Sequence, residues 1–186
     1  IPFNGRSTVR MTDDAATLSF EFKVVKAAYY PFSKVELAFR DRAGKPAFVD
    51  LSRYSAVAFD VKCTPANTLA FGLVMFEDQV SVLGKPDTYR LPYAYFFCNE
   101  NGEHIELDLA HLRTDQWWYD TYKLNLSHQD YRLDKIAKLS FGSTFQSPYD
   151  TVSKVQVRQL TLLGRDITHA DAKAMRYRLR QEPGPE

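Results

Sequence analysis

The chain has 186 residues, of which 45% are hydrophobic and 25% are charged, and its formal net charge is +1. This composition predicts a globular domain with a core and excludes wholesale disorder. A nearly neutral chain also lacks the dense basic face that general nucleic-acid binding requires, so no nucleic-acid partner is expected. Aromatic residues make up 14% of the chain, which favours β-strands and supplies rings for ligand contacts.

Alternation of apolar and polar residues dominates the chain and predicts about nine strands. The predicted strands cover roughly 18–24, 35–39, 57–63, 69–75, 91–98, 105–109, 116–126, 136–141 and 155–162. The segment 91–98 is apolar on both faces, which indicates a central strand. The alternation shifts its parity between Val157 and Leu160, as a β-bulge would produce. Short strands without long helices between them predict an all-β fold, an antiparallel β-sandwich or jelly roll.

One helix is predicted after the last strand, at about 167–181. Thr168 begins a pattern similar to a capping box, and Ala172, Met175 and Leu179 then form an apolar stripe. We expect a sandwich domain over 5–164 and an exit helix with a tail over 165–186. The helix either folds back on the sandwich or connects it to a further segment of the protein.

Cys63 and Cys98 each end an apolar run and are followed by turn residues. Two strand ends at the same rim of a sandwich satisfy disulfide geometry, so we predict a disulfide between them. The alternative is a pair of small core residues. Disulfides persist in oxidising compartments, and the predicted location is therefore periplasmic or extracellular.

The sequence lacks the motifs of common catalytic sites. Its four histidines lie outside any nucleophile motif, neither cysteine has protease-like neighbours, and no phosphate-binding loop is present. Carboxylate pairs such as Glu77 and Asp78 are interpreted as solvated surface groups and not as a glycosidase pair. We therefore predict a protein that is not an enzyme and that uses no cofactor.

The aromatic residues left over from the core predict a binding surface. A sugar is bound by a flat ring against the apolar face of the pyranose, while planar polar side chains reach its hydroxyls. On a strand over 116–126, Trp117 and Tyr119 would face outward if Trp118 faces inward. The predicted ligand-binding residues are Trp117, Tyr119, Tyr89, Arg90, Tyr93, Tyr95, Gln79 and Gln146. The alternative is that these aromatic side chains belong to the core.

Three segments resemble galactose-binding-like jelly rolls, a group that includes many carbohydrate-binding modules. They are VDLSRYSAVAFDVKC at 49–63, WWYDTYKLNL at 117–126 and DKIAKLSFGSTFQSPYDTVSKVQVRQLTLL at 134–163. The resemblance covers about residues 5–164 and implies the fold more strongly than the ligand. It places a structural calcium, where one exists, at Asp13, Asp14 and Asp166. Since no EF-hand-like loop supports such a site, no metal is predicted.

The basic helix after the last strand adds a second resemblance, to the extracytoplasmic sensor regions of bacterial membrane signalling proteins. It implies a non-catalytic ligand-binding or sensor domain whose output module is a diguanylate cyclase, a histidine kinase or a transcriptional regulator. The expected ligand is a carbohydrate or another small molecule, and the membrane is reached only through a segment outside this chain. Against this, Arg176, Arg178 and Arg180 are of the type that marks the cytoplasmic side of a span. The alternatives are a carbohydrate-binding module of a secreted glycoside hydrolase and a structural interaction module without a small ligand.

Overall fold

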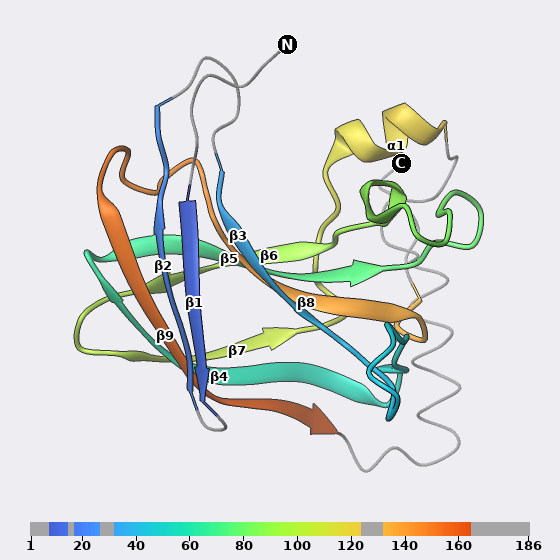
Figure 1. Cartoon of the computed structure of the whole chain (residues 1–186), viewed down its shortest axis with the longest axis horizontal. Helices are drawn as coiled ribbons and strands as arrows, with labels where there is room; N and C mark the ends of the chain where they lie inside the picture. The colour runs from blue at the N-terminus through green and yellow to red at the C-terminus, as the bar shows by residue number, and fades with distance from the viewer. Residues whose placement is uncertain (1–7, 15–16, 27–31, 124–131, 165–186) are drawn as a thin grey trace, which may run out of the picture.

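Two antiparallel sheets face each other in the computed structural model, which describes residues 8–14, 17–26, 32–123 and 132–164 (Figure 1). One sheet has the strand order β1-β2-β9-β4-β7 and the other the order β3-β8-β5-β6. The strands are β1 (Thr8–Asp14), β2 (Thr17–Lys23), β3 (Lys34–Ala38), β4 (Tyr54–Thr64), β5 (Asn67–Met75), β6 (Tyr93–Cys98), β7 (Glu103–Asp108), β8 (Ile136–Ser143) and β9 (Val152–Gly164). A 3-10 turn, η1 (Pro86–Thr88), and one helix, α1 (Gln116–Tyr122), complete the described elements. The predicted all-β sandwich of jelly-roll type is confirmed.

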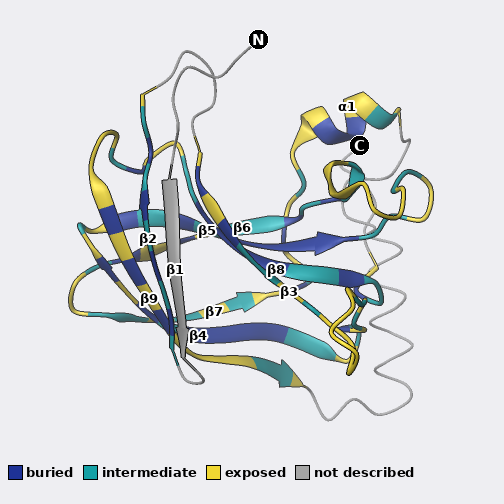
Figure 2. Cartoon of the chain, in the orientation of Figure 1, coloured by how far each residue is buried: buried dark blue, intermediate teal, exposed yellow. Residues whose placement is uncertain are grey.

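The core lies between the sheets and is built from the inward positions of the predicted alternation. Along β2 every second residue is buried, and Figure 2 shows buried and exposed positions alternating along several strands. Phe59, Phe71 and Phe141 meet at the centre, with ring centroids 5.4 to 6.0 Å apart. Burial of such rings is the main favourable term for a fold of this kind.

The parity shift between Val157 and Leu160 is a β-bulge in β9, as predicted. Asp60 of β4 pairs with Arg158, whereas Ala58 pairs with Thr161, so β9 contains one extra residue there. Gln159 takes a left-handed conformation with φ of 52°, which absorbs the additional residue.

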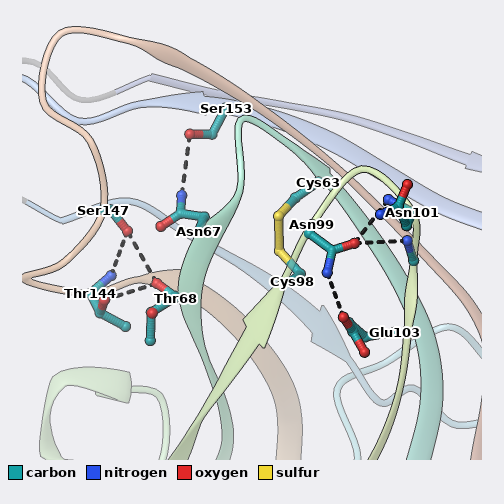
Figure 3. Close-up of a disulfide and its surroundings, with 11 residues drawn as sticks. Cys63, Asn67, Thr68, Cys98, Asn99, Asn101, Glu103, Thr144, Ser147 and Ser153 are labelled. Atoms are coloured by element: carbon teal, nitrogen blue, oxygen red, sulfur yellow. Dashed lines mark hydrogen bonds between the residues drawn. A yellow bond between two sulfur atoms is a disulfide. The ribbon is translucent and has the colours of Figure 1, made fainter.

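The predicted disulfide is also confirmed. Cys63 of β4 is bonded to Cys98 of β6, with their Cα atoms 5.7 Å apart, so the bond joins the two sheets at one rim (Figure 3). Next to it, the Asn99 side chain accepts hydrogen bonds from the backbone of Asn101 and Gly102 and shapes the turn into β7. The rim is therefore fixed by a covalent bond and by a hydrogen-bonded turn.

Two predictions about strands are wrong. The segment 91–98 is not a central strand, because β6 lies at the edge of the four-stranded sheet. The segment 116–126 does not form one long strand, because its first seven residues form α1. Trp118 and Tyr122 do share a face, but as residues four apart on a helix, with ring centroids 5.1 Å apart. Lys123, with φ of 53°, ends the helix in a left-handed conformation.

Several predictions fall outside what the structure describes. The exit helix and tail over 165–186 lie outside the described residues, as do the carboxylate of Asp166 and the side chains of Asp13 and Asp14 that a calcium would need. Among the described residues, no helix is long and apolar enough to cross a membrane. That same part of the chain contains no group of three or more His, Cys, Asp or Glu side chains suited to a metal ion.

Candidate functional site

The outer face of the four-stranded sheet, turned away from the core, has an unusual composition. Directly opposed residues of antiparallel strands share a face, so the register places Ala70 between Gly142 and Tyr95, and Gly72 between Ser140 and Tyr93. The middle of this face therefore carries only small side chains, while aromatic rings stand along β6.

The two glycines leave no room for a side chain on this face. A Cβ added to Gly72 would lie 3.0 Å from the Cδ1 atom of Leu91 and 3.2 Å from the carbonyl oxygen of Pro92. A Cβ added to Gly142 would lie 3.3 Å from both the Lys34 Cβ atom and the Ser33 carbonyl oxygen. Both glycines are buried, and these positions thus require glycine for the close approach of neighbouring chain segments.

Tyr93, Tyr95 and Trp117 form what we call the aromatic platform. The rings of Tyr93 and Tyr95 lie 5.2 Å apart on β6, and Trp117 in α1 is linked to Tyr93 through the carboxylate of Asp115. Tyr95 is 48% exposed and Trp117 is 59% exposed. Folding normally buries rings of this size, so an exposed group of them, with polar partners, is typical of a binding surface.

Asp115 links the platform to α1. Its Oδ1 atom accepts a hydrogen bond of 2.5 Å from the Tyr93 hydroxyl, and its Oδ2 atom accepts one of 3.2 Å from the Trp117 indole nitrogen. Asp115 occupies the N-cap position of α1, yet its side chain makes no capping bond to the helix. The carboxylate that would usually stabilise the helix end is instead directed at two platform rings.

The hydroxyl of Tyr93 is held in its protonated form. Burial first, and then the hydrogen bond to the Asp115 carboxylate, raise the pKa of Tyr93 well above its ordinary value. The hydroxyl therefore remains a donor to Asp115 across the neutral and mildly alkaline range.

Arg90 fixes the segment that carries Asp115 and Trp117. Its side chain is 0% exposed and donates to the Thr114 hydroxyl at 3.0 Å and to the Tyr119 hydroxyl at 2.5 Å. The guanidinium lies over the rings of Trp118 and Tyr119, with centroids 5.5 and 5.2 Å away. Arg90 thus holds the segment through Thr114 before Asp115 and through Tyr119 after it.

Glu77 balances the charge of this buried cation. Its Oε2 atom lies 3.4 Å from the Nη1 atom of Arg90, and it follows the end of β5. Figure 1 shows α1 and the loop between β5 and β6 at the same end of the sandwich. The buried ion pair therefore joins the loop, the end of the sheet and the helix that presents the platform.

A second polar group lies at the opposite margin of the same face. On β3, Lys34 Nζ lies 2.6 Å from Glu36 Oε1, and Lys138 Nζ of β8 lies 2.5 Å from Glu36 Oε2. Burial raises the pKa of Glu36, but hydrogen bonds to Lys138 and Lys34 and their charges lower it by more, so the net pKa lies below the ordinary value. The margin therefore carries two cations on one carboxylate.

The predicted site residues are only partly brought together. Tyr93, Tyr95 and Trp117 form the platform, whereas Arg90 and Tyr119 are buried beneath it. The predictions that Tyr119 faces outward from a strand and that Arg90 meets a ligand directly are therefore corrected: both side chains support α1 from inside.

The other predicted residues lie elsewhere. Tyr89 packs against Phe76 with ring centroids 5.4 Å apart, in a separate aromatic group. Gln79 is exposed beyond the end of β5, and Gln146 is exposed in the loop between β8 and β9. That loop is bonded through Thr144 to Thr68 at the start of β5, so the two glutamines lie at opposite ends of the strand.

Sequence reasoning missed Asp115 and Arg113. Arg113 pairs with Tyr93 through two backbone hydrogen bonds of 2.9 Å and is exposed beside it. The available signal was the segment Arg113-Thr114-Asp115-Gln116, in which an N-cap residue precedes a helical pair of aromatic residues. A strand predicted from 116 onward hides this signal, because it leaves Asp115 before a strand and not at the start of a helix.

Comparison with known proteins supports the fold. The chain is similar to the family 11 carbohydrate-binding module from Clostridium thermocellum in complex with a β-1,3-1,4-mixed-linked tetrasaccharide, with a TM-score of 0.58 and 14% identity over 86% of this chain and 83% of that one. It is also similar to a family 30 carbohydrate-binding module, with a TM-score of 0.53 and 15% identity over 85% and 84% of the two chains. No protein-family model and no curated protein matches the sequence. At this identity the likeness shows a shared jelly-roll fold, and the ligand must be argued from the residues.

Proposed function

We propose that this chain is a non-catalytic carbohydrate-binding domain whose ligand lies on the outer face of the four-stranded sheet. The observation that carries the proposal is the exposed aromatic platform, with a carboxylate that holds Tyr93 and Trp117 in place. A pyranose presents an apolar face to rings and hydroxyls to polar groups at their edge. Ala70, which lies opposite Tyr95 in the register, adds only a methyl group next to the platform.

The non-catalytic assignment is supported by how the carboxylates are used. Glycoside hydrolysis needs two carboxyl groups free to act across one bond. Glu77 is paired with buried Arg90, Asp78 is paired with Lys135 at 2.5 Å, and Asp115 holds platform rings. These groups have structural partners that explain their positions without catalysis.

We further propose that the domain acts outside the cytoplasm, since its disulfide is favoured in an oxidising compartment. A sensor domain of a membrane signalling protein and a binding module of a secreted glycoside hydrolase both fit a sugar-binding sandwich. The sensor interpretation depends on 165–186, which lie outside the described residues. Sugar binding is common to both interpretations and is the function proposed for this chain.

The test is calorimetric titration of the chain with a panel of oligosaccharides. The first probe is the mixed-linked tetrasaccharide, because the family 11 module was solved in complex with it. We expect at least one sugar to bind and Trp117→Ala to weaken that binding about tenfold or more, the loss of one stacked ring. Tyr149→Ala is the matched control, since Tyr149 is an exposed aromatic residue on the β8–β9 loop. If no sugar binds, or both variants weaken binding equally, the proposal is wrong.

A further inference from the structure

We propose that the ligand of this face is an acidic oligosaccharide, with carboxylate groups on its sugar rings, and that Arg113 binds one of those carboxylates. The proposal rests on the proposed carbohydrate-binding function and adds the chemical class of the ligand. It is argued from the position of Arg113, from the state of Asp115 and from the charges at the far margin of the face.

Arg113 stands at the edge of the platform in a fixed position. Its backbone exchanges two hydrogen bonds of 2.9 Å with Tyr93, so their side chains share the outer face. Thr114, the next residue, is held by buried Arg90. A guanidinium presents a planar fork of donors that matches a carboxylate in two parallel hydrogen bonds. A sugar ring stacked on Tyr95 or Trp117 would bring a ring carboxylate within reach of this group.

Arg113 and Asp115, both within the described part of the chain, form no ion pair with each other. Both oxygens of Asp115 accept hydrogen bonds from platform rings. Among the residues that the structure describes, Arg113 makes no ion pair, in contrast to Arg90 and Arg132. A solvated cation beside an aromatic surface is therefore available to an anionic group of a ligand.

The opposite margin of the face is also positive. Lys34 and Lys138 share the single carboxylate of Glu36, and Glu36 lies in the same cross-strand row as Tyr93, three strand spacings or about 14 Å away. The two residues between them in this row, Ser140 and Gly72, are uncharged and buried. A sugar chain that crosses the strands would thus meet a cation at each margin, Arg113 at one and the two lysines at the other.

This arrangement distinguishes an acidic chain from a neutral one. A neutral oligosaccharide would use the rings but would offer no anion to Arg113 or to the two lysines, which share the single carboxylate of Glu36. A chain with carboxylates on more than one ring can pair with Arg113 at one margin and with the lysines at the other. Salt weakens this electrostatic attraction. The two ligand classes are therefore separable by charge alone.

The experiment compares tetrasaccharides that differ in charge but not in length. The probes are oligomers of galacturonate, glucuronate and mannuronate, each with its methyl ester, together with the neutral mixed-linked tetrasaccharide. At low ionic strength we expect one free acid to bind roughly three- to tenfold more tightly than its methyl ester, the value of an exposed charged contact. Arg113→Gln should remove that difference, while Arg113→Lys should keep part of it.

Lys154→Gln is the control for a general change of charge, because Lys154 is exposed on β9 in the other sheet. It should leave the preference for the acid unchanged. Equal affinity for acid and ester, or an equal loss for both in Arg113→Gln, would overturn the proposal. If a neutral sugar binds in a way that depends on Trp117 but not on Arg113, the acidic class is wrong and the sugar-binding function stands. If no probe binds, the binding function itself fails.

Discussion

The outer faces of the two sheets follow the same alternating pattern but carry different residues. On the five-stranded sheet many outward positions are polar, and two cross-strand pairs join opposite charges: Lys154 lies opposite Glu21, and Arg158 lies opposite Asp60. On the four-stranded sheet they are aromatic along β6 and small in the middle. The first face is an ordinary solvated surface. The second exposes rings that folding alone would bury, which makes it the candidate binding face.

The contrast extends to how each face is supported. Outward groups on the five-stranded sheet interact at the surface, as His104 does with Asp60 at 2.7 Å. The aromatic face has a buried layer beneath one end, in which Arg90 connects Thr114, Tyr119 and Glu77. Surface pairs contribute little to stability, whereas a buried cation is costly unless every partner is in place. The second face is therefore both more rigid and more sensitive to change.

The largest effect is expected when this support is removed. Arg90→Ala leaves Glu77 without its partner and a cavity under α1, and should lower the free energy of unfolding by about 4 kcal/mol. Sugar binding should weaken as well, because the segment carrying Asp115 and Trp117 loses its anchor. Urea unfolding and calorimetric titration at a temperature where the variant is folded measure the two effects.

Arg132→Ala is the matched control for Arg90. Arg132 is an exposed arginine that pairs with Asp134 and Asp78, so its removal should change stability by only about 0.5 kcal/mol. A similar loss of stability in both variants would show that the buried layer gives the aromatic face no special support.

The disulfide separates stability from binding. It joins the sheets on their inner side, between β4 and β6, and closes a loop whose ends are 35 residues apart. The double variant Cys63→Ser with Cys98→Ser should therefore lose about 3 kcal/mol, or about 10 °C in melting temperature. Affinity for sugar at 25 °C should stay unchanged, since the platform residues of β6 face the other way.

Differential scanning calorimetry measures the melting temperature, and calorimetric titration of the same sample measures the affinity for sugar. Wild-type protein treated with a reductant should match the variant. An affinity that falls together with the melting temperature would mean that the outer face of β6 depends on the bond beneath it.

Most of the sandwich could be predicted because its strands have one buried face. The alternation in β2, β4, β5 and β9 states which side meets the core, and even the bulge near Gln159 appears as a change of parity. The two wrong predictions concern segments in which alternation does not identify a single buried face of a strand. In 91–98 both faces are apolar, but the reason is exposed rings on an edge strand and not double burial. In 116–122 residues four apart satisfy a strand and a helix equally.

The candidate site is less predictable than the fold, because local alternation does not report contacts between distant segments. Its rings could be named from the sequence, but their grouping depends on contacts between distant segments. Asp115 becomes a site residue only because the bridge between Arg113 and Tyr93 brings its segment beside β6. Arg90 resembles a surface residue in the sequence, and its burial follows from the position of α1 over the end of the sheet. No local pattern encodes either contact.

The smallest expected effect concerns the polar margin of the aromatic face. The folded pKa of Glu36 is lowered by its two lysines, so the stability it contributes is fully present above its ordinary pKa of 4.5 and is lost as the pH falls through the folded value. At pH 7 the wild type should melt slightly above Glu36→Gln, and this difference should shrink toward zero as the pH falls below 4.5. Lys138→Gln, which removes one partner of Glu36, should show the same convergence. A difference that stays constant from pH 7 to strongly acidic conditions would mean that the charge of Glu36 contributes nothing and that this margin, like the outer face of the five-stranded sheet, is merely solvated.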